Sequence, residues 1–277
     1  DHTIIFISHK IREVMQICDN ITVLRAGRTV GSIPVANATE EDISRFMVGR
    51  DVILKMNKKP AEFGDTLLKV TDLTYENKEG RKLLDHVSFS LKKGQILGIA
   101  GVEGNGQNEL AEAIFGFYSG VKGSILFDGK EILGKSIRAI RDDGISYIPE
   151  DRIKTGAAGN ISLWGNMIAD IIDSPLLKKH GLLNYKNIHE RADKLISDFG
   201  VLCQNDDQPI GMLSGGNMQK VVVAREFSSD PKLLIANQPT RGIDVGANEF
   251  IWKKIIEQRD AGKGVILISA DLNEIME

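Results

Sequence analysis

The stretch that decides the fold is Leu213-Ser214-Gly215-Gly216-Asn217, together with the apolar run that follows it. We expect a helix to begin at Asn217 and to continue to Arg225, with residues 221–224 on its buried side. Ser214 and the two glycines leave backbone N–H groups uncovered at the positive end of this helix, where a phosphate binds well. Two interpretations stay open: an anion site, or an ordinary capped helix with glycines in its first turn.

The residues after this helix predict a helix end, a short strand and a polar loop. Asp230-Pro231 ends the helix, because proline cannot continue it. Residues 233–236 form a short apolar run that predicts a buried strand. The strand is followed by Asn237-Gln238-Pro239-Thr240 and Arg241-Gly242-Ile243-Asp244.

This order resembles the ATP-binding cassette (ABC) ATPases, in which a signature loop, a helix, a nucleotide-binding strand and a loop ending in aspartate follow one another. Two motifs are most similar to those of importers with two cassettes fused in one chain. They are Leu-Ser-Gly-Gly-Asn-x-Gln-Lys-Val and, after it, Gln-Pro-Thr-Arg-Gly-Ile-Asp-Val-Gly-Ala. Those importers serve simple sugars and nucleosides, and the likeness is greatest to the nucleoside (guanosine-type) branch. The resemblance implies an α/β P-loop NTPase fold with a helical subdomain and an antiparallel β subdomain.

Composition fits a protein of this class. The 277 residues carry a net charge of −3, which gives no reason to expect a nucleic-acid partner. Cys18 and Cys203 are too few and too far apart for a disulfide framework, so we expect reduced cytosolic thiols. No apolar run is long enough to cross a bilayer. Attachment to the cytoplasmic face of a bacterial plasma membrane would therefore go through another protein.

An internal repeat divides the chain. Residues 5–15 (Ile-Phe-Ile-Ser-His-Lys-Ile-Arg-Glu-Val-Met) recur as residues 266–276 (Ile-Leu-Ile-Ser-Ala-Asp-Leu-Asn-Glu-Ile-Met), at an offset of 261 (270 minus 9). The offset is close to the length of one cassette. Chance similarity of two strand–helix junctions is the alternative, and the Ser and Glu shared at fixed offsets argue against it.

From this repeat we expect a fragment with three segments. Residues 1–50 are the C-terminal tail of a first cassette, 51–65 are a linker, and 66–277 are a second cassette truncated at its C-terminus. The helical subdomain covers about residues 151–212. By the resemblance, it receives the membrane permease subunit. Trp164 is either an anchor for that contact or an ordinary buried tryptophan.

The tail predicts a strand, a helix, a hairpin and a second helix. Residues 3–7 predict a buried strand, and His9 stands at its end. A lone histidine is more often structural, but by the resemblance His9 matches the switch histidine that contacts the γ-phosphate. A hairpin is expected to turn at Ala26-Gly27, and Thr39-Glu40-Glu41-Asp42 predicts a capped helix. So short a segment cannot bury its apolar side chains alone, so we expect it to dock where the second cassette lacks its own tail, in this chain or a neighbour. These side chains are Ile21, Val23, Leu24, Val30, Ile33 and Phe46.

A second phosphate-binding element is predicted near the start of the second cassette. A buried strand at residues 95–100 leads into a glycine-rich loop and a helix, which together can cradle a phosphate. An intact loop of this kind continues with lysine for the phosphates and Ser or Thr for Mg²⁺. Here Gln107 and Asn108 take those places, and Glu109 adds negative charge. We expect at most a weak nucleotide cradle from Gly101, Gly104, Gly106, Gln107 and Asn108.

The same loss of charged groups continues downstream. By the resemblance, Asn237 and Gln238 stand where the family has the Mg²⁺-binding aspartate and the catalytic glutamate. Neither amide can act as a base or offer a carboxylate to Mg²⁺. Ala270 replaces the switch histidine, and Glu150 begins a loop in which many cassettes carry glutamine. We therefore expect a pseudo-site without a metal ligand. An aromatic residue near Tyr75 would stack on adenine in the family; a tyrosine packed on its neighbours is the alternative.

Cassettes of this family pack head to tail, with each ATP and its Mg²⁺ between the phosphate loop of one and the signature of the other. Leu213, Ser214, Gly215, Gly216 and Asn217 would thus serve ATP held by the first cassette. Asp244 would help the two sites communicate; a capping aspartate is the alternative.

The sequence thus predicts part of the ATPase of an importer for nucleosides or simple sugars. The expected partners are the permease subunits, the first cassette and, indirectly, an extracytoplasmic substrate-binding protein. The alternative is a non-hydrolytic scaffold of a transporter.

Overall fold

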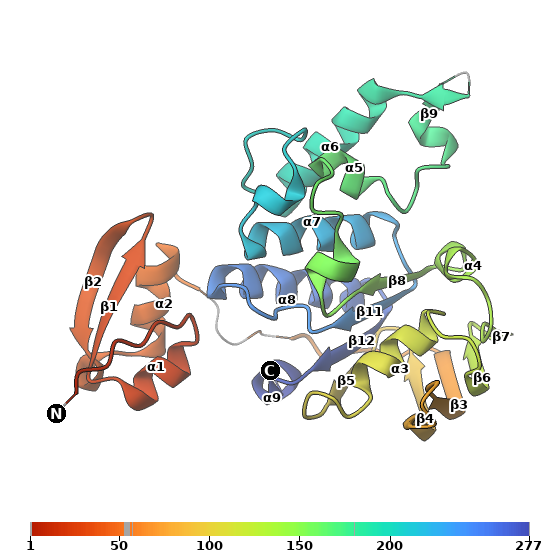
Figure 1. The fold of residues 1–277 in the computed structure, drawn as a ribbon, viewed down its shortest axis with the longest axis horizontal. Helices are drawn as coiled ribbons and strands as arrows, with labels where there is room; N and C mark the ends of the chain where they lie inside the picture. Colours follow the sequence, from red (N-terminus) through yellow and green to blue (C-terminus); the bar gives the residue numbers. More distant parts are fainter. Residues whose placement is uncertain (1, 53–55, 57, 180, 277) are drawn as a thin grey trace.

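The computed structural model describes residues 2–276 apart from 53–55, 57 and 180 (Figure 1). A parallel sheet lies at its centre. Two long helices, α7 (Gly215–Ser228) and α8 (Val245–Asp260), cover one face. The other face packs against an antiparallel sheet and helix α3 (Gln107–Ile114). The predicted α/β fold, with an antiparallel β subdomain and a helical subdomain, is confirmed.

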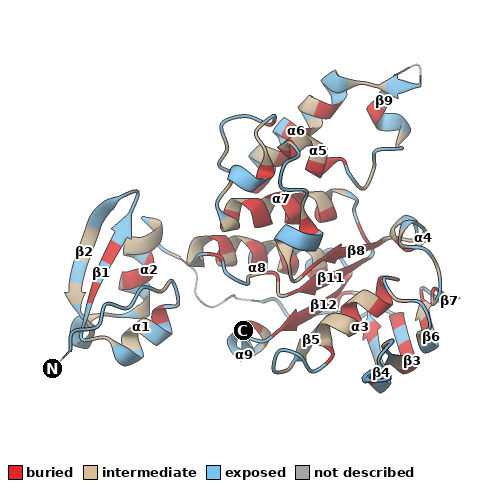
Figure 2. Cartoon of the chain, viewed as in Figure 1, coloured by how far each residue is buried: buried red, intermediate tan, exposed pale blue. Residues whose placement is uncertain are grey.

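The central sheet has four parallel strands in the order β5-β12-β11-β8. Every residue of β11 and β12 is buried (Figure 2). Parallel strands covered on both faces are continuous apolar runs, and the run that predicted β11 is of this kind. The strands are β5, Ile96–Ala100; β8, Ile145–Ile148; β11, Leu233–Asn237; and β12, Gly264–Ser269.

Alternate side chains of β11 serve the two faces of this sheet. Leu234 and Ala236 belong to the core formed with α7 and α8. Leu233 and Ile235 belong to the core formed with α3 and the antiparallel sheet. Because two cores meet at these strands, the loops at their carboxyl ends stand on a rigid base.

Strand β5 corrects one expectation. The predicted strand is present, but the prediction that it is buried is wrong, because its residues are only partly buried or exposed. β5 is at the edge of the sheet, where β12 is its partner. An apolar run alone does not distinguish a central strand from an edge strand.

The antiparallel sheet has the order β4-β3-β6-β7 and packs closely on the central sheet. Gly264, the first residue of β12, lies at this contact. A Cβ there would lie 2.6 Å from Leu67 Cδ2, so only glycine fits. The strands are β3, Thr66–Glu76; β4, Lys82–Lys92; β6, Lys122–Phe127; and β7, Lys130–Glu131. Helix α4 (Ile137–Asp142) precedes β8, and α9 (Leu272–Met276) follows β12.

The helical part occupies residues 152–212. Its longest helix, α6 (Tyr185–Phe199), ends at Gly200 in the left-handed conformation, as its sequence predicts. Trp164, in α5 (Leu163–Met167), is partly buried in this part. Its indole ring packs edge-on against Tyr185. The short elements are a π-turn at Arg152–Gly156, η3 (Pro175–Leu177), β9 (Lys178–Lys179), β10 (Leu182–Leu183) and η4 (Ile210–Met212).

Residues 11–48 form the small unit beside α8. The predicted hairpin is confirmed, because Ala26 and Gly27 both adopt the positive φ that its tight turn needs. The predicted capped helix is confirmed too: Thr39 and Asp42 form a reciprocal capping box. The elements are α1 (Ile11–Ile17), β1 (Asn20–Arg25), β2 (Arg28–Pro34), η1 (Val35–Asn37) and α2 (Glu40–Val48).

Two expectations for residues 1–50 are wrong. Residues 3–7 form no strand, and Ile4 and Ile7 are 84% and 92% exposed. A strand needs a neighbour for its backbone hydrogen bonds, and no described strand pairs with this segment. Leu24, expected in the core of the unit, is 69% exposed, while Ile21, Val23 and Ile43 are buried.

The small unit docks on the start of α8 within the same chain. Val245 packs against its buried cluster. Arg50 forms an ion pair with Glu249 at 2.7 Å, and this hydrogen bond raises the pKa of the Arg50 guanidinium. A Cβ at Gly246 would lie 3.2 Å from a methyl group of Val48, so the two helices are in close contact.

No helix in the described part of the chain combines the length and the apolar character needed to span a membrane.

The docking is tested by Val245→Asp. An acidic residue at the first position of α8 suits the positive end of this helix, so α8 itself is preserved. The new charge would face the apolar cluster of the small unit. We expect faster hydrogen exchange across β1, β2 and α2, with unchanged exchange in β11 and β12. Unchanged exchange in the small unit would show that α8 does not hold it.

Candidate functional site

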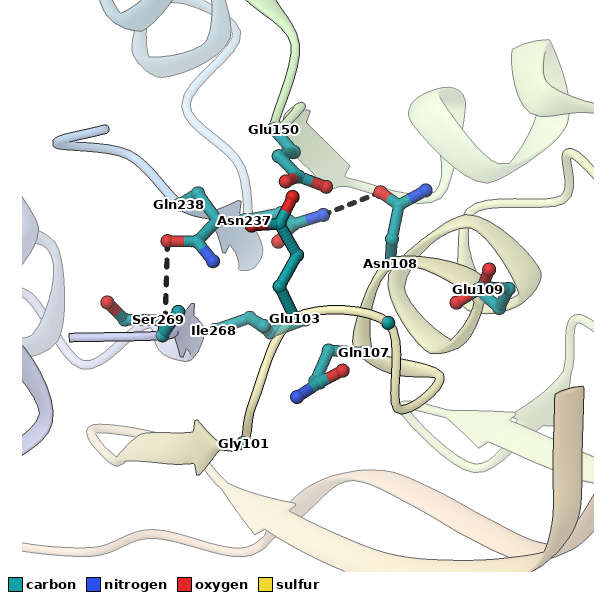
Figure 3. Close-up of a pocket in the computed structure, with 12 residues that line it drawn as sticks. Gly101, Glu103, Gln107, Asn108, Glu109, Glu150, Asn237, Gln238, Ile268 and Ser269 are labelled. Carbon is teal, nitrogen blue, oxygen red and sulfur yellow. Dashed lines mark hydrogen bonds between the residues drawn. The ribbon is translucent and has the colours of Figure 1, made fainter. Parts of the chain in front are cut away.

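A cavity of about 220 Å³ lies at the carboxyl ends of β5, β11 and β12 (Figure 3). This edge of a parallel sheet is where α/β proteins bind ligands. The predicted glycine-rich loop, the start of α3 and the end of β11 meet here, so most of the predicted pseudo-site residues are brought together. The lining residues are Gly101, Glu103, Gly104, Gln107, Asn108, Glu109, Glu150, Asn237, Gln238, Ile268, Ser269 and Ala270.

The glycine-rich loop is closed by the side chain of Gln107. Its Nε2 donates to the carbonyl of Val102 at 2.9 Å, and its Oε1 accepts from the backbone N–H of Asn105 at 3.0 Å. A Cβ on Gly101 would lie 2.0 Å from this Nε2. The amide thus occupies the loop and bonds one of the N–H groups that a phosphate would need.

Two more amides meet across the cavity. Asn237 Nδ2 donates to Asn108 Oδ1 at 2.8 Å, and Asn237 is almost completely buried. Gln238 has a φ of 51°, unusual for a residue with a side chain, and its Oε1 accepts from the backbone N–H of Ala270 at 3.3 Å. These groups satisfy one another, and none can take up a proton as a base near neutral pH.

The remaining charged groups of the cavity wall form an ion-pair bridge. Arg241 pairs with Glu150, and its Nη2 lies 3.1 Å from Glu103 Oε1. Figure 3 shows Glu103 reaching from the loop toward Glu150. Burial raises the pKa of the Glu150 carboxyl, Glu103 and Glu109 raise it further, and Arg241 opposes them. Among the described residues of this bridge, Arg241 is shared between two carboxylates, so the bridge carries a net negative charge that disfavours anions.

The signature stretch lies outside this cavity. Ser214 caps α7, and its Oγ accepts from the N–H of Asn217 at 3.4 Å. The helix begins at Gly215 rather than at Asn217, because the serine cap stands one residue before the first glycine. Asn217 Oδ1 accepts from the N–H of Leu202 at 2.9 Å and ties α7 to the loop after α6. Leu213 is partly buried against the core.

Three other candidate residues are placed as follows. Asp244 caps α8 by accepting from the N–H of Ala247 at 3.0 Å, as the capping alternative proposed. Tyr75 stacks on Tyr118 with ring centroids 4.5 Å apart, so it packs on a neighbour. His9 is exposed and does not line the cavity.

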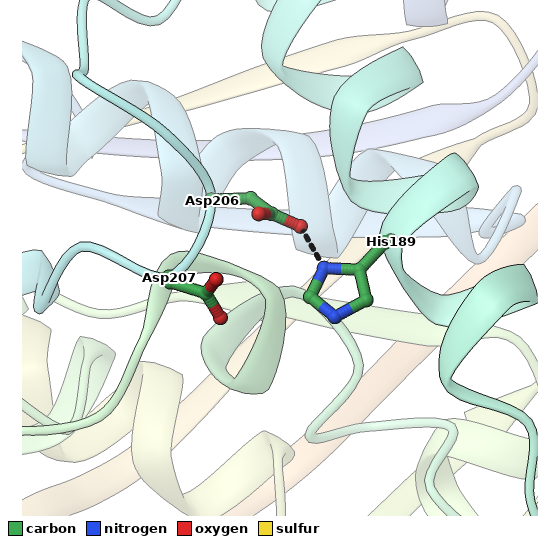
Figure 4. Close-up of side chains that lie close together, drawn as sticks. All are labelled: His189, Asp206 and Asp207. Carbon is green, nitrogen blue, oxygen red and sulfur yellow. Dashed lines mark hydrogen bonds and ion pairs between the residues drawn. The ribbon is translucent and has the colours of Figure 1, made fainter.

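One cluster with metal-ligating atoms occurs among the described residues: His189, Asp206 and Asp207, whose ligand atoms lie within 4.8 Å of one another (Figure 4). His189 Nδ1 lies 2.5 Å from Asp206 Oδ2, and this hydrogen bond raises the pKa of the imidazole. Trp164 Nε1 donates to Asp207 Oδ1 at 2.9 Å. A protonated histidine paired with a carboxylate accounts for this arrangement, so we assign no metal to it.

The sequence pattern of the family described as ABC transporter matches residues 84–241. The chain belongs to the ABC transporter family. It is 39% identical to a glucose import ATP-binding protein of Haloferax volcanii over 99% of this chain, and 40% identical to a guanosine import ATP-binding protein of Bacillus subtilis over 94%. These alignments cover 50% and 51% of the relatives. The chain thus spans about half the length of the curated relatives it matches.

A solved structure supports the same assignment. The crystal structure of a nucleotide-free ATP-binding cassette from an ABC transporter matches this ABC chain with a TM-score of 0.64 and 26% identity. The match covers 76% of this chain and 84% of the other.

Sequence reasoning missed the bridge from Glu103 through Arg241 to Glu150. It also missed the contacts of Arg152, which donates to the carbonyls of Arg241 and Gly242. The opposite charges of Glu103 and Glu150 on one side and Arg241 on the other were the available signal. These charges predict an ion pair only when the fold brings their three loops together.

The pH dependence of stability tests the His189 ion pair. The pKa of His189 is raised above its usual 6.5, so the pair stabilises the fold fully below that pH. This contribution is lost as pH rises through the folded pKa. We expect His189→Ala to lower Tm by a few degrees at pH 6 and by less at pH 9, in thermal unfolding.

Asp206→Asn provides the matched control for this prediction, because it removes the same ion pair from the other side. An equal loss of Tm at both pH values for both variants would show that packing, rather than charge, holds the cluster.

Proposed function

We propose that this ABC chain is part of the ATP-binding subunit of an importer for nucleosides or simple sugars, in which two cassettes are fused. Residues 1–50 are then the tail of the first cassette, residues 51–65 the linker and residues 66–277 the second cassette. The relatives' names and the alignment to about half of their length support this proposal. The repeat at an offset of 261 residues (270 minus 9) supports it as well.

In this proposal the second cassette's own cavity does not hydrolyse ATP. The observation that supports it is the self-closed loop, in which the Gln107 side chain donates to the carbonyl of Val102 and occupies the N–H of Asn105. Asn237 and Gln238 offer neither a carboxylate for Mg²⁺ nor a base for water. The residues present therefore do not fit Mg²⁺-bound ATP, and no chemical step is assigned to this cavity.

The signature stretch keeps its function in this proposal. Ser214, Gly215 and Gly216 stand at the N-terminus of a 14-residue helix, where backbone N–H groups and the helix dipole favour an anion. That anion is the γ-phosphate of ATP held, with Mg²⁺, by the first cassette. His9 is the switch histidine of that cassette, and Asp244 stands in the loop that contacts it.

The proposed partners follow from the same assignment. The helical part, residues 152–212, receives the cytoplasmic surface of the permease subunits, and the complex lies on the cytoplasmic face of a bacterial plasma membrane. An extracytoplasmic binding protein delivers the solute. Nucleic acid is not among the partners.

A second candidate function is a scaffold that hydrolyses no ATP at either site. The acidic wall of the cavity, in which Glu103 and Glu150 share Arg241, favours it as far as this chain's own site is concerned. The intact Ser214 to Asn217 stretch favours the working partner site. The two variants described below distinguish these functions.

One prediction of this proposal concerns the chain alone. Purified residues 1–277 are expected to show no ATPase activity above background at any protein concentration, because amides stand at positions 107, 237 and 238, where the proposal needs a lysine, a Mg²⁺ ligand and a base. Phosphate release with and without Mg²⁺ is the measurement. Magnesium-dependent turnover that Gln238→Ala abolishes would contradict the pseudo-site.

Another prediction of this proposal concerns the protein that carries both cassettes. Ser214→Arg removes the cap of α7 and places a bulky side chain where the γ-phosphate must approach, so ATPase activity and uptake should be lost. Gln238→Ala should leave both nearly unchanged. Ser90→Arg, at an exposed position of β4, is the control for adding an arginine. Equal activity of all three variants would contradict the proposed site between the first cassette and the signature stretch. Absence of ATPase activity in the unmodified protein would favour the scaffold function.

A further inference from the structure

Arg152 lies between the two loops that surround the start of α7. We propose that Arg152 is a positioning residue of the signature site, which holds the turn at Arg241 and Gly242 against Gly215 and so fixes the first turn of α7. The inference rests on the proposed function of the signature, but its contacts are independent of that function.

The guanidinium of Arg152 donates to two consecutive backbone carbonyls. Nη1 lies 2.6 Å from the Arg241 oxygen, and Nη2 lies 3.3 Å from the Gly242 oxygen. A planar fork of donors is needed to hold two adjacent acceptors at once. The side chain therefore fixes both the position and the orientation of this turn.

The same guanidinium packs directly on the signature. A Cβ on Gly215 would lie 2.7 Å from Arg152 Nη2, so a side chain there would displace the guanidinium from its present position. The neighbouring Gly216 is less tightly confined, with a Cβ that would lie 3.1 Å from Asp244 Oδ2. Both glycines of the signature therefore touch the 241–244 loop or the arginine that holds it.

A third contact joins α7 to this loop farther along the helix. Gln219, which is buried, donates to the carbonyl of Pro239 at 2.8 Å. That bond is one turn inside α7. Arg152 is thus the side chain that packs against the first turn of α7, where a phosphate would bind.

The charge of Arg152 is not neutralised by a carboxylate contact among the described residues. Its acceptors are neutral carbonyls, and its buried Nε has no hydrogen-bond partner there. Asp151, the adjacent carboxylate, accepts instead from the N–H groups of Ile153 and Lys154. The guanidinium therefore adds positive potential at the positive end of α7, where an arriving anion meets both.

Arg241 extends the link to the degenerate cavity. Its backbone carbonyl accepts from Arg152, while its side chain bridges Glu150 and Glu103. The turn that Arg152 holds is therefore joined through Arg241 to Glu150 and Glu103, which line the cavity. The ion-pair bridge gives the second cassette a fixed cavity wall that needs no nucleotide.

Kinetics of the protein that carries both cassettes test the positioning role. Arg152→Ala should lower kcat for ATP about 10- to 100-fold and change KM less than about threefold, because a displacement near 1 Å costs up to about 100-fold in rate. Arg152→Lys keeps the charge without the fork, and should stay at least about tenfold below the unmodified protein. Arg138→Ala, at an exposed position of α4, is the matched control and should leave kcat unchanged.

Three kinetic outcomes would overturn the inference. They are a kcat within twofold for Arg152→Ala, a change in KM alone, and full activity of Arg152→Lys, which would show that charge suffices. If Ser214→Arg also leaves ATPase activity intact, the proposed function fails as well, and hydrogen exchange in this chain then decides the inference by itself.

Hydrogen exchange of residues 1–277 is that independent measurement. Arg152→Ala should speed exchange at residues 213–217 and 241–244 together, with β11 and β12 unchanged. Arg138→Ala should change neither loop. Unchanged exchange at both loops in Arg152→Ala would overturn the positioning role, whatever the fate of the proposed function.

Discussion

The pairing of β11 with β12 is the constraint on which the rest of the structure depends. Both strands are buried along their whole length, and their carboxyl ends bring Asn237 and Ser269 to one edge of the sheet. Each large apolar side chain buried there contributes roughly 1.5–3 kcal/mol. The position of the edge is therefore set by the two cores and does not rely on polar contacts in the cavity. Amide side chains such as those of Asn237 and Gln238 can therefore occupy this edge without loss of the fold.

Local patterns in the sequence were enough to predict much of the architecture. The buried run of β11, the turn at Ala26 and Gly27 and the capping box at Thr39 each depend on residues close together in the chain. The failures depend on distant neighbours. The run at residues 95–100 is an edge strand, and residues 3–7 have no described strand beside them. Whether an apolar run is buried is decided by what the rest of the chain places against it.

The candidate site divides in the same way. Motif spacing placed Gln107, Asn237 and Gln238 at the right positions around the cavity. It did not indicate that Gln107 folds back into its own loop, because that depends on the rotamer of one side chain. It also missed the contacts of Arg152 and Arg241, whose partners lie between 89 and 138 residues away along the chain. Such contacts become visible only when the loops are assembled.

The uncovered segment at residues 3–7 has a consequence for the behaviour of the molecule in solution. Four of its five side chains, those of Ile4, Ile5, Phe6 and Ile7, are apolar and exposed, and its sequence suits an extended conformation. A backbone of this kind, with open donors and acceptors, is a template for pairing with a strand of another chain. Such a strand would supply the hydrogen-bond partners that this segment lacks among the described strands, and it would cover the four apolar side chains.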